Sequence, residues 1–278
     1  MAKLVAAFGV SHAPGQTGIP ELAPTFKKEN VYKAWECLRV KFADARPDIL
    51  VGISNDHLQN FFQIQPPFCV GVAETHILPM ESYAKNVRLT SHPVAGHPGF
   101  AQDLIRIASE NGLDLAFSEE LYFRDDFSIP KHFLDPNDEV PLVPILTNCL
   151  HRNQPAPKRF FELGRIIAKT IASRPANERV AVIATGGLSH DPTGPNWCLI
   201  DKDFDQRFLE HLVSGNTQAL LREFTLERIY EPGKGGTPEI LNWFAALGAV
   251  GAGTRATLLC YEAVPEWATG MGYIAWDI

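Results

Sequence analysis

Four side chains in this sequence could together bind a metal ion and move protons: His12, His57, His190 and Glu239. Two imidazoles and one carboxylate can occupy one face of Fe(II) and leave the remaining coordination positions open for a substrate and O2. A further histidine near such a centre can act as a general acid or base. The four residues are far apart in the chain, so the elements that carry them decide whether they meet.

Each of the three histidines follows an apolar segment with the pattern of a buried strand. The first segment ends at the turn Ser11-His12-Ala13-Pro14-Gly15, which contains His12, and the segment before His190 ends at Gly186-Gly187. Ligands bind α/β sheets beyond the carboxyl ends of their strands, so we expect the three histidines to lie at one edge of a sheet. The predicted strands cover residues 3–10, 49–54 and 180–183.

Glu239 follows a different pattern, the start of a helix. Thr237-Pro238-Glu239 predicts the N-cap, N1 and N2 positions, with proline where its missing N–H costs nothing. The dipole of such a helix favours an ionised carboxylate in its first turn, which is the form that binds a metal.

The rest of the chain alternates between helical and strand patterns, which predicts one α/β domain over residues 1–278. We expect a central mixed sheet with helices on both faces. The segment 74–97 is predicted to be a long loop that covers the site, and the segment 119–139 to be irregular. Further helices are predicted at 28–44, 98–111, 157–174, 203–213 and 216–223, and further strands at 68–72, 113–117, 140–146, 256–263 and 272–276.

Composition excludes several classes of protein. The net charge is -7 and the Lys and Arg residues are scattered, which argues against a nucleic-acid partner. The five cysteines form no C-x-x-C pair, which indicates neither a disulfide framework nor a thiolate zinc site, and favours a reducing cytoplasm. No apolar run is long enough to span a bilayer, and no signal peptide is evident.

Other candidate motifs are weaker. The Gly233–Gly236 turn does not match a phosphate-binding loop, and Ser189-His190 lacks the G-x-S-x-G surroundings of a serine nucleophile. His97-Pro98 is typical of a helix start. Most of the remaining histidines are predicted to be solvated; the group consists of His76, His92, His97, His132, His151 and His211.

Four short motifs occur in a recognisable order: Ser11-His12-Ala13-Pro14, Asn55-Asp56-His57, Gly186-Gly187-Leu188-Ser189-His190 and Glu239-Ile240-Leu241-Asn242-Trp243. This ordered set resembles the class III extradiol ring-cleavage dioxygenases, the superfamily of the catalytic subunit of protocatechuate 4,5-dioxygenase. The resemblance extends over almost the whole chain, including Cys69–Thr75 and Gly96-His97-Pro98.

The resemblance implies that His12, His57 and Glu239 bind Fe(II) and that His190 is the acid-base residue. O2 would be the co-substrate, and a small aromatic diol or related ring would be the substrate. Many members of the superfamily carry a second active-site histidine in an Asp-His-Gly stretch, where this chain has Arg124-Asp125-Asp126. Asp125, Asp126 and His132 are the candidates to replace it.

Two alternatives share the same fold: a zinc-dependent hydrolase that uses the same ligands, and a non-catalytic binding protein. Metal analysis with an oxygen-uptake assay separates the first from a dioxygenase. A binding protein would have no need to retain His190 beside the three ligands. The superfamily also suggests a homodimer, in some members with a separate small subunit.

Overall fold

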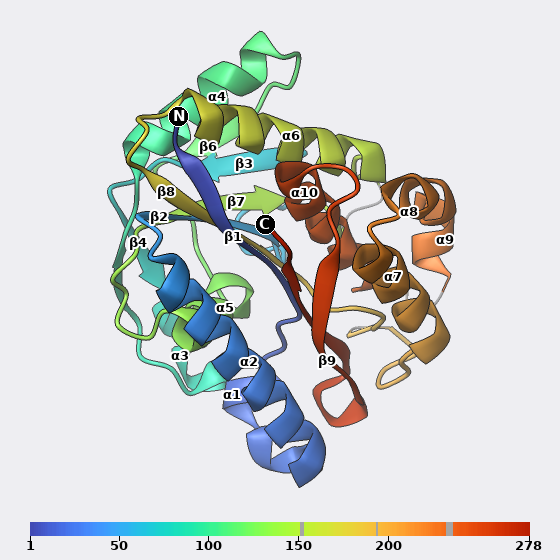
Figure 1. The fold of residues 1–278 in the computed structure, drawn as a ribbon. Helices are drawn as coiled ribbons and strands as arrows, with labels where there is room; N and C mark the ends of the chain where they lie inside the picture. The colour runs from blue at the N-terminus through green and yellow to red at the C-terminus, as the bar shows by residue number, and fades with distance from the viewer. Residues whose placement is uncertain (151–152, 193, 232–235) are drawn as a thin grey trace.

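The computed structural model describes residues 1–150, 153–192, 194–231 and 236–278, and its centre is an eight-stranded mixed sheet (Figure 1). The strand order is β6-β3-β7-β2-β8-β1-β10-β9, and the four central strands β7, β2, β8 and β1 are parallel. The strands are β1 (Lys3–Val10), β2 (Ile49–Asn55), β3 (Phe68–Gly71), β6 (Ala116–Ser118), β7 (Leu142–Thr147), β8 (Arg179–Thr185), β9 (Ala256–Val264) and β10 (Thr269–Trp276). The prediction of a mixed α/β sheet is confirmed.

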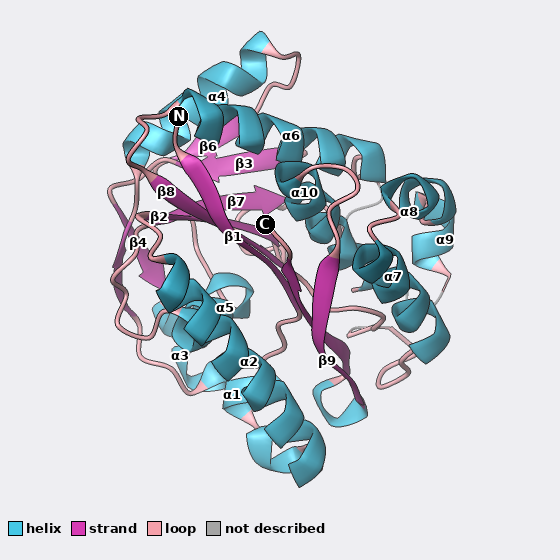
Figure 2. Ribbon diagram, viewed as in Figure 1, coloured by secondary structure: helices cyan, strands magenta, loops and turns pink. Residues whose placement is uncertain are grey.

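Helices cover both faces of this sheet (Figure 2). One face packs against α2 (Thr25–Ala45) and α5 (Asp125–Leu134), and the other against α4 (Pro98–Glu110), α6 (Pro157–Ser173), α7 (Lys202–Ser214) and α10 (Leu241–Val250). Shorter helices are α1 (Gly15–Gly18), α3 (Glu81–Val87), α8 (Thr217–Glu223) and α9 (Leu226–Tyr230). In the part of the chain that is described, no helix is long and apolar enough to cross a bilayer.

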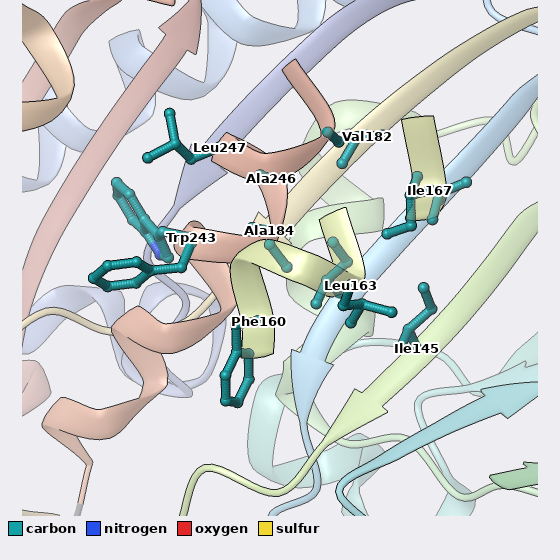
Figure 3. Packing of buried hydrophobic residues seen from close by; sticks show 14 of the residues in the cluster. Ile145, Phe160, Leu163, Ile167, Val182, Ala184, Trp243, Ala246 and Leu247 are labelled. Carbon is teal, nitrogen blue, oxygen red and sulfur yellow. The ribbon is translucent and has the colours of Figure 1, made fainter. Parts of the chain in front are cut away.

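An apolar layer of buried side chains lies between the sheet and the pair α6 and α10 (Figure 3). Helices α6 and α10 approach closely because both carry a glycine at the contact. A Cβ on Gly164 would lie 1.9 Å from Ala245 O, and one on Gly248 would lie 2.1 Å from Phe161 O. Side chains from four elements fill the layer, namely Ile145 from β7, Val182 and Ala184 from β8, Phe160, Leu163 and Ile167 from α6, and Trp243, Ala246 and Leu247 from α10.

The central strands end at the same level. Val10 of β1 pairs with Thr185 of β8, and Asn55 of β2 pairs with Thr147 of β7. The loops that follow β1, β2 and β8 therefore leave the sheet side by side. This register explains why residues more than a hundred positions apart can form one site.

Two predictions about irregular segments were wrong. The segment 74–97 contains a two-stranded sheet, β4 (Thr75–Leu78) and β5 (His92–Ala95), with α3 between them. The segment 119–139 contains α5, which includes Pro130 in its interior. Proline usually argues against a helix because it cannot donate to the carbonyl four residues earlier. Here that carbonyl, Asp126 O, accepts a hydrogen bond from Thr185 Oγ1 at 3.0 Å, so it is satisfied by tertiary structure.

Candidate metal site

The structure brings His12, His57 and Glu239 together at the carboxyl edge of the sheet. One potential ligand atom from each residue lies within 4.8 Å of the other two. His12 Nε2 is 3.4 Å from His57 Nε2, and Glu239 places Oε1 3.4 Å from His57 Nε2 and Oε2 3.9 Å from His12 Nε2. Two imidazoles and a carboxylate converging in this way could hold one divalent metal ion on a single face.

The ring of His12 is fixed by a hydrogen-bond chain from the end of β8. His12 Nδ1 lies 3.1 Å from Thr185 Oγ1, which in turn donates to Asp126 O, the carbonyl left free by Pro130. A carbonyl can only accept, so the Thr185 hydroxyl gives its single proton to Asp126 O. In its contact with His12 the hydroxyl oxygen must therefore accept, from His12 Nδ1–H. The Nε2 lone pair of His12 then faces His57 and Glu239, as a metal-binding histidine requires.

Glu239 is held in place by neighbours from two strand ends. Gly187 N donates to Oε2 at 2.8 Å, and Asn55 Nδ2 donates to Oε1 at 3.3 Å. The turn after β8 can approach this closely because it is glycine: a Cβ on Gly186 would lie 2.8 Å from Glu239 Cβ. Although burial alone would raise the pKa of Glu239, the neighbouring His190, His57 and His12 hold it well below the usual range. The carboxylate is therefore ionised.

The local structure around Glu239 differs from the predicted helix start. Residues Thr237–Ile240 form a short 3-10 turn, and α10 begins at Leu241. Thr237 does not cap the helix, because its hydroxyl accepts a hydrogen bond from His190 N at 3.1 Å. The residue thus joins the Glu239 turn to the His190 loop.

The start of α10 is anchored to the ends of the strands. Asn242 Nδ2 donates to Thr185 O at 2.8 Å, and its Oδ1 accepts from Thr147 Oγ1 at 2.7 Å. Trp243 Nε1 donates to Gly186 O at 3.2 Å. These bonds fix the height of Glu239 above the sheet.

The two histidines of this site have opposite pKa shifts in the metal-free protein. Burial lowers the pKa of His12 to about 4. Burial also disfavours the charged form of His57, but the carboxylates of Asp125 and Glu239 outweigh it and raise the pKa to about 9. A metal ion bound here would displace the extra proton from His57. The positive charge of the ion would then neutralise Glu239 in place of the protonated imidazole. His57 Nδ1 is buried without a hydrogen-bond partner, so that ring is less firmly oriented than His12.

His190 lies beside this set in a defined tautomer. Its Nδ1 is 2.7 Å from Leu188 O, an acceptor, so Nδ1 carries a proton and Nε2 is directed toward Glu239 Oε1 at 3.6 Å. Burial lowers the pKa of His190, but the negative charge of Glu239 outweighs burial and the net shift is upward. A buried imidazole whose Nε2 faces the three donors can exchange protons with a group bound there.

The loop of His190 is tied to α7 through Asp205. Its carboxylate accepts from Ser189 N at 2.7 Å and from Ser189 Oγ at 2.9 Å. Tyr261 OH donates to the same carboxylate at 2.8 Å. The His190 loop is therefore held by two hydrogen-bonding residues, Asp205 of α7 and Thr237.

A further side chain beside the site comes from α5, a segment that was predicted to be irregular. Asp125 is 3 % exposed, and its Oδ2 lies 4.0 Å from His12 Nε2. Of the candidates to replace a second histidine, Asp125 is the one that borders the site. Asp126 instead accepts from Gln59 Nε2 and from Arg124 N, and His132 packs against Phe133 at the other end of α5.

The remaining histidines lie outside this group. His92 is exposed and His97 accepts from Phe100 N at 3.0 Å, as expected for a helix start. His92 and His132 are exposed, and His97 is partly exposed, whereas His76 and His211 are buried and are exceptions to the expectation that most of these histidines are solvated. His211 Nε2 is 2.7 Å from Glu223 Oε2. His151 and the Gly233–Gly235 part of the glycine turn lie outside the described residues.

Comparison with known proteins places the chain in a family. Residues 6–272 match the model of the catalytic LigB subunit of aromatic ring-opening dioxygenase, and the chain belongs to this family. Its relatives include a 2,3-dihydroxyphenylpropionate/2,3-dihydroxicinnamic acid 1,2-dioxygenase from Rhodococcus jostii (strain RHA1), 27% identical over 88% of this chain and 90% of that protein. The enzyme of the same description from Escherichia coli (strain K12) is 27% identical over 85% of this chain and 88% of its own length.

A solved structure shares the fold. The crystal structure of the uncharacterized protein JW3007 from Escherichia coli K12 aligns with a TM-score of 0.62 over 98% of this chain and 100% of that chain. The sequence identity is 17%, so this likeness concerns the fold alone. Together, the family and the named relatives support a ring-cleaving dioxygenase in general terms, and the His12, His57 and Glu239 group is a candidate for the metal that such an enzyme uses.

Proposed function

We propose that this protein is a non-haem Fe(II)-dependent extradiol dioxygenase that cleaves the ring of a catechol-like compound with O2. In this proposal His12, His57 and Glu239 bind the iron and His190 is the acid-base residue. The observation that carries it is the convergence of two imidazoles and one ionised carboxylate beside a fourth group, His190, whose Nε2 faces them.

The donor set fits Fe(II) in its chemistry. Two neutral imidazoles and one carboxylate give the mixed nitrogen and oxygen face that Fe(II) oxygenases use. Bound iron would hold a diol and O2 together and pass electrons between them. Thr185, Asn55 and Gly187 orient these donors, which is the support that metal sites generally require.

His190 provides the proton transfers in this proposal. A vicinal diol must lose protons to chelate a metal with both oxygens, and His190 Nε2 can accept one of them because Nδ1–H is engaged by Leu188 O. The Glu239 charge nearby favours the imidazolium that results. The same group can later return the proton to an oxygen atom as the ring opens. Asp205 and Thr237, through Ser189 N and His190 N, keep the imidazole in position for both steps.

A substrate screen tests the proposal. The protein is reconstituted anaerobically with Fe(II), offered protocatechuate, gallate, a methylated gallate, an aminophenol or a hydroxypyridone, and exposed to O2. We expect a ring-opened product from at least one of these compounds, detected by mass as the gain of both oxygen atoms. Failure of every compound to bind the iron-loaded protein would contradict the proposal.

A further inference from the structure

A groove lies between α7, α8 and β9, the strand that ends the sheet (Figure 1). This β9 groove has a volume of about 820 Å³, which is within the range of pockets that hold small organic molecules. None of the described residues that line it is a candidate metal ligand. The β9 groove is therefore separate from the site at the carboxyl ends of the strands.

The charged side chains of the β9 groove leave one cation without a carboxylate partner. Arg207 is paired with Glu223 at 3.0 Å and with Glu210 at 3.3 Å. The Arg255 side chain makes a single hydrogen bond, from Nε to Val213 O at 3.4 Å, and no described carboxylate lies within 4.0 Å of its guanidinium. The exposed N–H groups of Arg255 are free to bind an anion, and a planar guanidinium matches the two oxygens of a carboxylate.

A neutral donor lies beside this cation. Asn216 Oδ1 accepts from Ala219 N at 3.2 Å, and Asn216 Nδ2 has no partner among the described residues. Asn216 follows Gly215, and a Cβ on Gly215 would lie only 3.1 Å from Arg255 Cγ. Gly215 ends α7 with a φ of 70°, where glycine is favoured, and its missing side chain lets Arg255 pass. The β9 groove thus offers two kinds of donor to one acceptor group.

An apolar surface adjoins these donors. Leu209, Leu258 and Tyr261 line the same groove. Leu209 is buried, whereas Leu258 is 42% exposed, so a ligand that covers Leu258 would remove apolar surface from water. A cation, an amide donor and an apolar surface together favour a carboxylate that is joined to an apolar group. A bare anion would leave the apolar surface uncovered, and a cationic ligand would be repelled by Arg255.

Tyr261 connects the β9 groove to the His190 loop. Its hydroxyl donates to Asp205 Oδ2 at 2.8 Å, and Asp205 Oδ1 accepts from Ser189 N at 2.7 Å. Burial, and then the charge of Asp205, raise the pKa of Tyr261, so the hydroxyl keeps the proton that it donates. The space around the carboxylate is small, since a Cβ on Gly270 would lie 2.3 Å from Asp205 Oδ2. Two hydrogen bonds therefore link the Tyr261 side chain to Ser189, the residue before His190.

We propose that the β9 groove is a second binding site, for a small carboxylate with an apolar body, and that its occupancy is transmitted through Tyr261 and Asp205 to the His190 loop. Arg255 and Asn216 bind the carboxylate, and the apolar body packs against the ring of Tyr261. A bound ligand restricts the motion of that ring, and this restriction makes Asp205 a more firmly held acceptor for the loop. The site regulates the order of the His190 loop and takes no part in the reaction at the metal.

Three probes that differ only in their head group test the site: 4-phenylbutyrate, 4-phenylbutan-1-ol and 4-phenylbutylamine. Their binding to the full-length protein is measured by NMR titration without O2, with and without Fe(II). We expect 4-phenylbutyrate to bind with a dissociation constant of about 1 mM, a usual value for a ligand of this size, whether or not the metal is present. The alcohol and the amine should bind at least about tenfold more weakly, because neither makes the charge-assisted hydrogen bonds to Arg255.

A variant at Arg255 assigns the binding to the β9 groove. In Arg255→Gln, 4-phenylbutyrate should bind within about twofold of the alcohol, since the charge that distinguishes the two probes is lost. Arg106→Gln, at an exposed arginine of α4, is the matched control and should bind all three probes as the wild type does. Equal affinities for the three probes in the wild type, or unchanged binding of 4-phenylbutyrate in Arg255→Gln, would overturn the site.

Hydrogen exchange tests the transmission. At saturating 4-phenylbutyrate the exchange of the Ser189 amide should slow about threefold or more, because its acceptor is held more firmly. Tyr261→Phe should bind the probe within about twofold of the wild type, since the missing hydroxyl is directed toward Asp205, but it should lose this protection. Tyr122→Phe, whose hydroxyl donates to Glu120 instead, is the control and should keep it. Exchange that does not respond to the probe, or protection that persists in Tyr261→Phe, would contradict the proposal.

The inference and the proposed function can fail separately. Probe affinity and hydrogen exchange are measured without turnover, so a negative result in either leaves the proposed function standing. Conversely, failure of every ring compound to bind the iron-loaded protein would leave the β9 groove and its link to Ser189 unaffected.

Discussion

The middle and the carboxyl end of strand β8 lie in opposite environments. Its middle, at Val182 and Ala184, is buried in the apolar layer against α6 and α10 (Figure 3). Its carboxyl end and the following loop, from Thr185 to His190, are buried among hydrogen-bonded polar groups and ionisable side chains. Side chains in the apolar layer are closely packed, whereas the residues around the polar end include buried atoms without a hydrogen-bond partner, such as His57 Nδ1 and Asp125 Oδ1.

This difference indicates a division of labour. Packing in the apolar layer contributes the folding free energy that holds the strand ends in register. The closely spaced, buried charged groups at the polar edge lower that free energy. Substitutions at the polar edge should therefore change metal binding and turnover more than the free energy of unfolding. Substitutions in the apolar layer should change the free energy of unfolding more than metal binding or turnover. Four sets of substitutions test this division, in order of their expected effect on activity.

The largest effect is expected from the three candidate metal ligands. His12→Ala, His57→Ala and Glu239→Ala should each abolish stoichiometric iron binding, a greater loss than the 10- to 100-fold typical of residues that only support a ligand. Metal analysis after dialysis measures this directly. His92→Ala, an exposed histidine paired with Asp138, is the control and should bind iron normally. Any of the three variants that keeps its iron removes that residue from the ligand set.

The next effect is expected from His190→Gln. Iron binding and diol chelation depend on other residues and should persist, while turnover should fall about 10²- to 10⁴-fold because a positioned proton carrier is lost. Single-turnover kinetics together with metal analysis separate the two properties. Loss of iron would identify His190 as a ligand, and unchanged turnover would leave it no role in proton transfer.

A smaller effect is expected from Asn55→Ala. Asn55 Nδ2 donates to Glu239 Oε1, so its removal should weaken Fe(II) binding about 10- to 100-fold without abolishing it. Competition with a chelator of known affinity measures the change. Asn60→Ala is the matched control, because Asn60 contacts Asp56 and Tyr122 instead of Glu239. An affinity equal to that of the wild type would show that Gly187 N alone orients the carboxylate.

The smallest effect on activity is expected from Leu163→Ala in the apolar layer. Leu163 is fully buried, and truncation of such a leucine costs about 2–5 kcal/mol of unfolding free energy. Urea unfolding at fixed metal concentration measures the loss, and kcat below the unfolding transition should match the wild type. Leu199→Ala, at an exposed leucine, should change neither quantity. A large fall in kcat for Leu163→Ala would show that the two regions are not separable.

Most of the fold could be predicted because its elements carry strong local patterns. Strand β1 matches the predicted Lys3–Val10 to the residue, and α2 and α6 lie within a few residues of their predicted bounds. Helix α5 was missed because Pro130 argues against a helix. The compensating interaction, from Thr185 Oγ1 to Asp126 O, joins residues 59 positions apart and leaves no local signal. The strands β4 and β5 are only four residues each, too short for a pattern to be distinctive.

The candidate site was predictable where the residues follow strand ends. His12, His57 and His190 meet because the parallel strands end in register, a rule that applies to the whole fold class. Glu239 was predicted at a helix start, but its position depends on Asn242 and Trp243, which donate to Thr185 O at the end of β8 and to Gly186 O in the turn that follows. The proximity of Asp125 to His12 could not be inferred, since it depends on a helix that the sequence does not reveal. The Asp-Asp pair in place of an expected histidine was the one signal available.

The central claim is that His12, His57 and Glu239 form a redox-active iron site for ring cleavage. The most direct test loads the metal-free protein with Fe(II) or with Zn(II) and follows O2 consumption and ring-opened product on the same substrate. The Fe(II) protein should consume O2 and form product in equal amounts, and the Zn(II) protein should bind the same substrate without consuming O2. Turnover by the Zn(II) protein, or product formation without O2 consumption, would contradict the account.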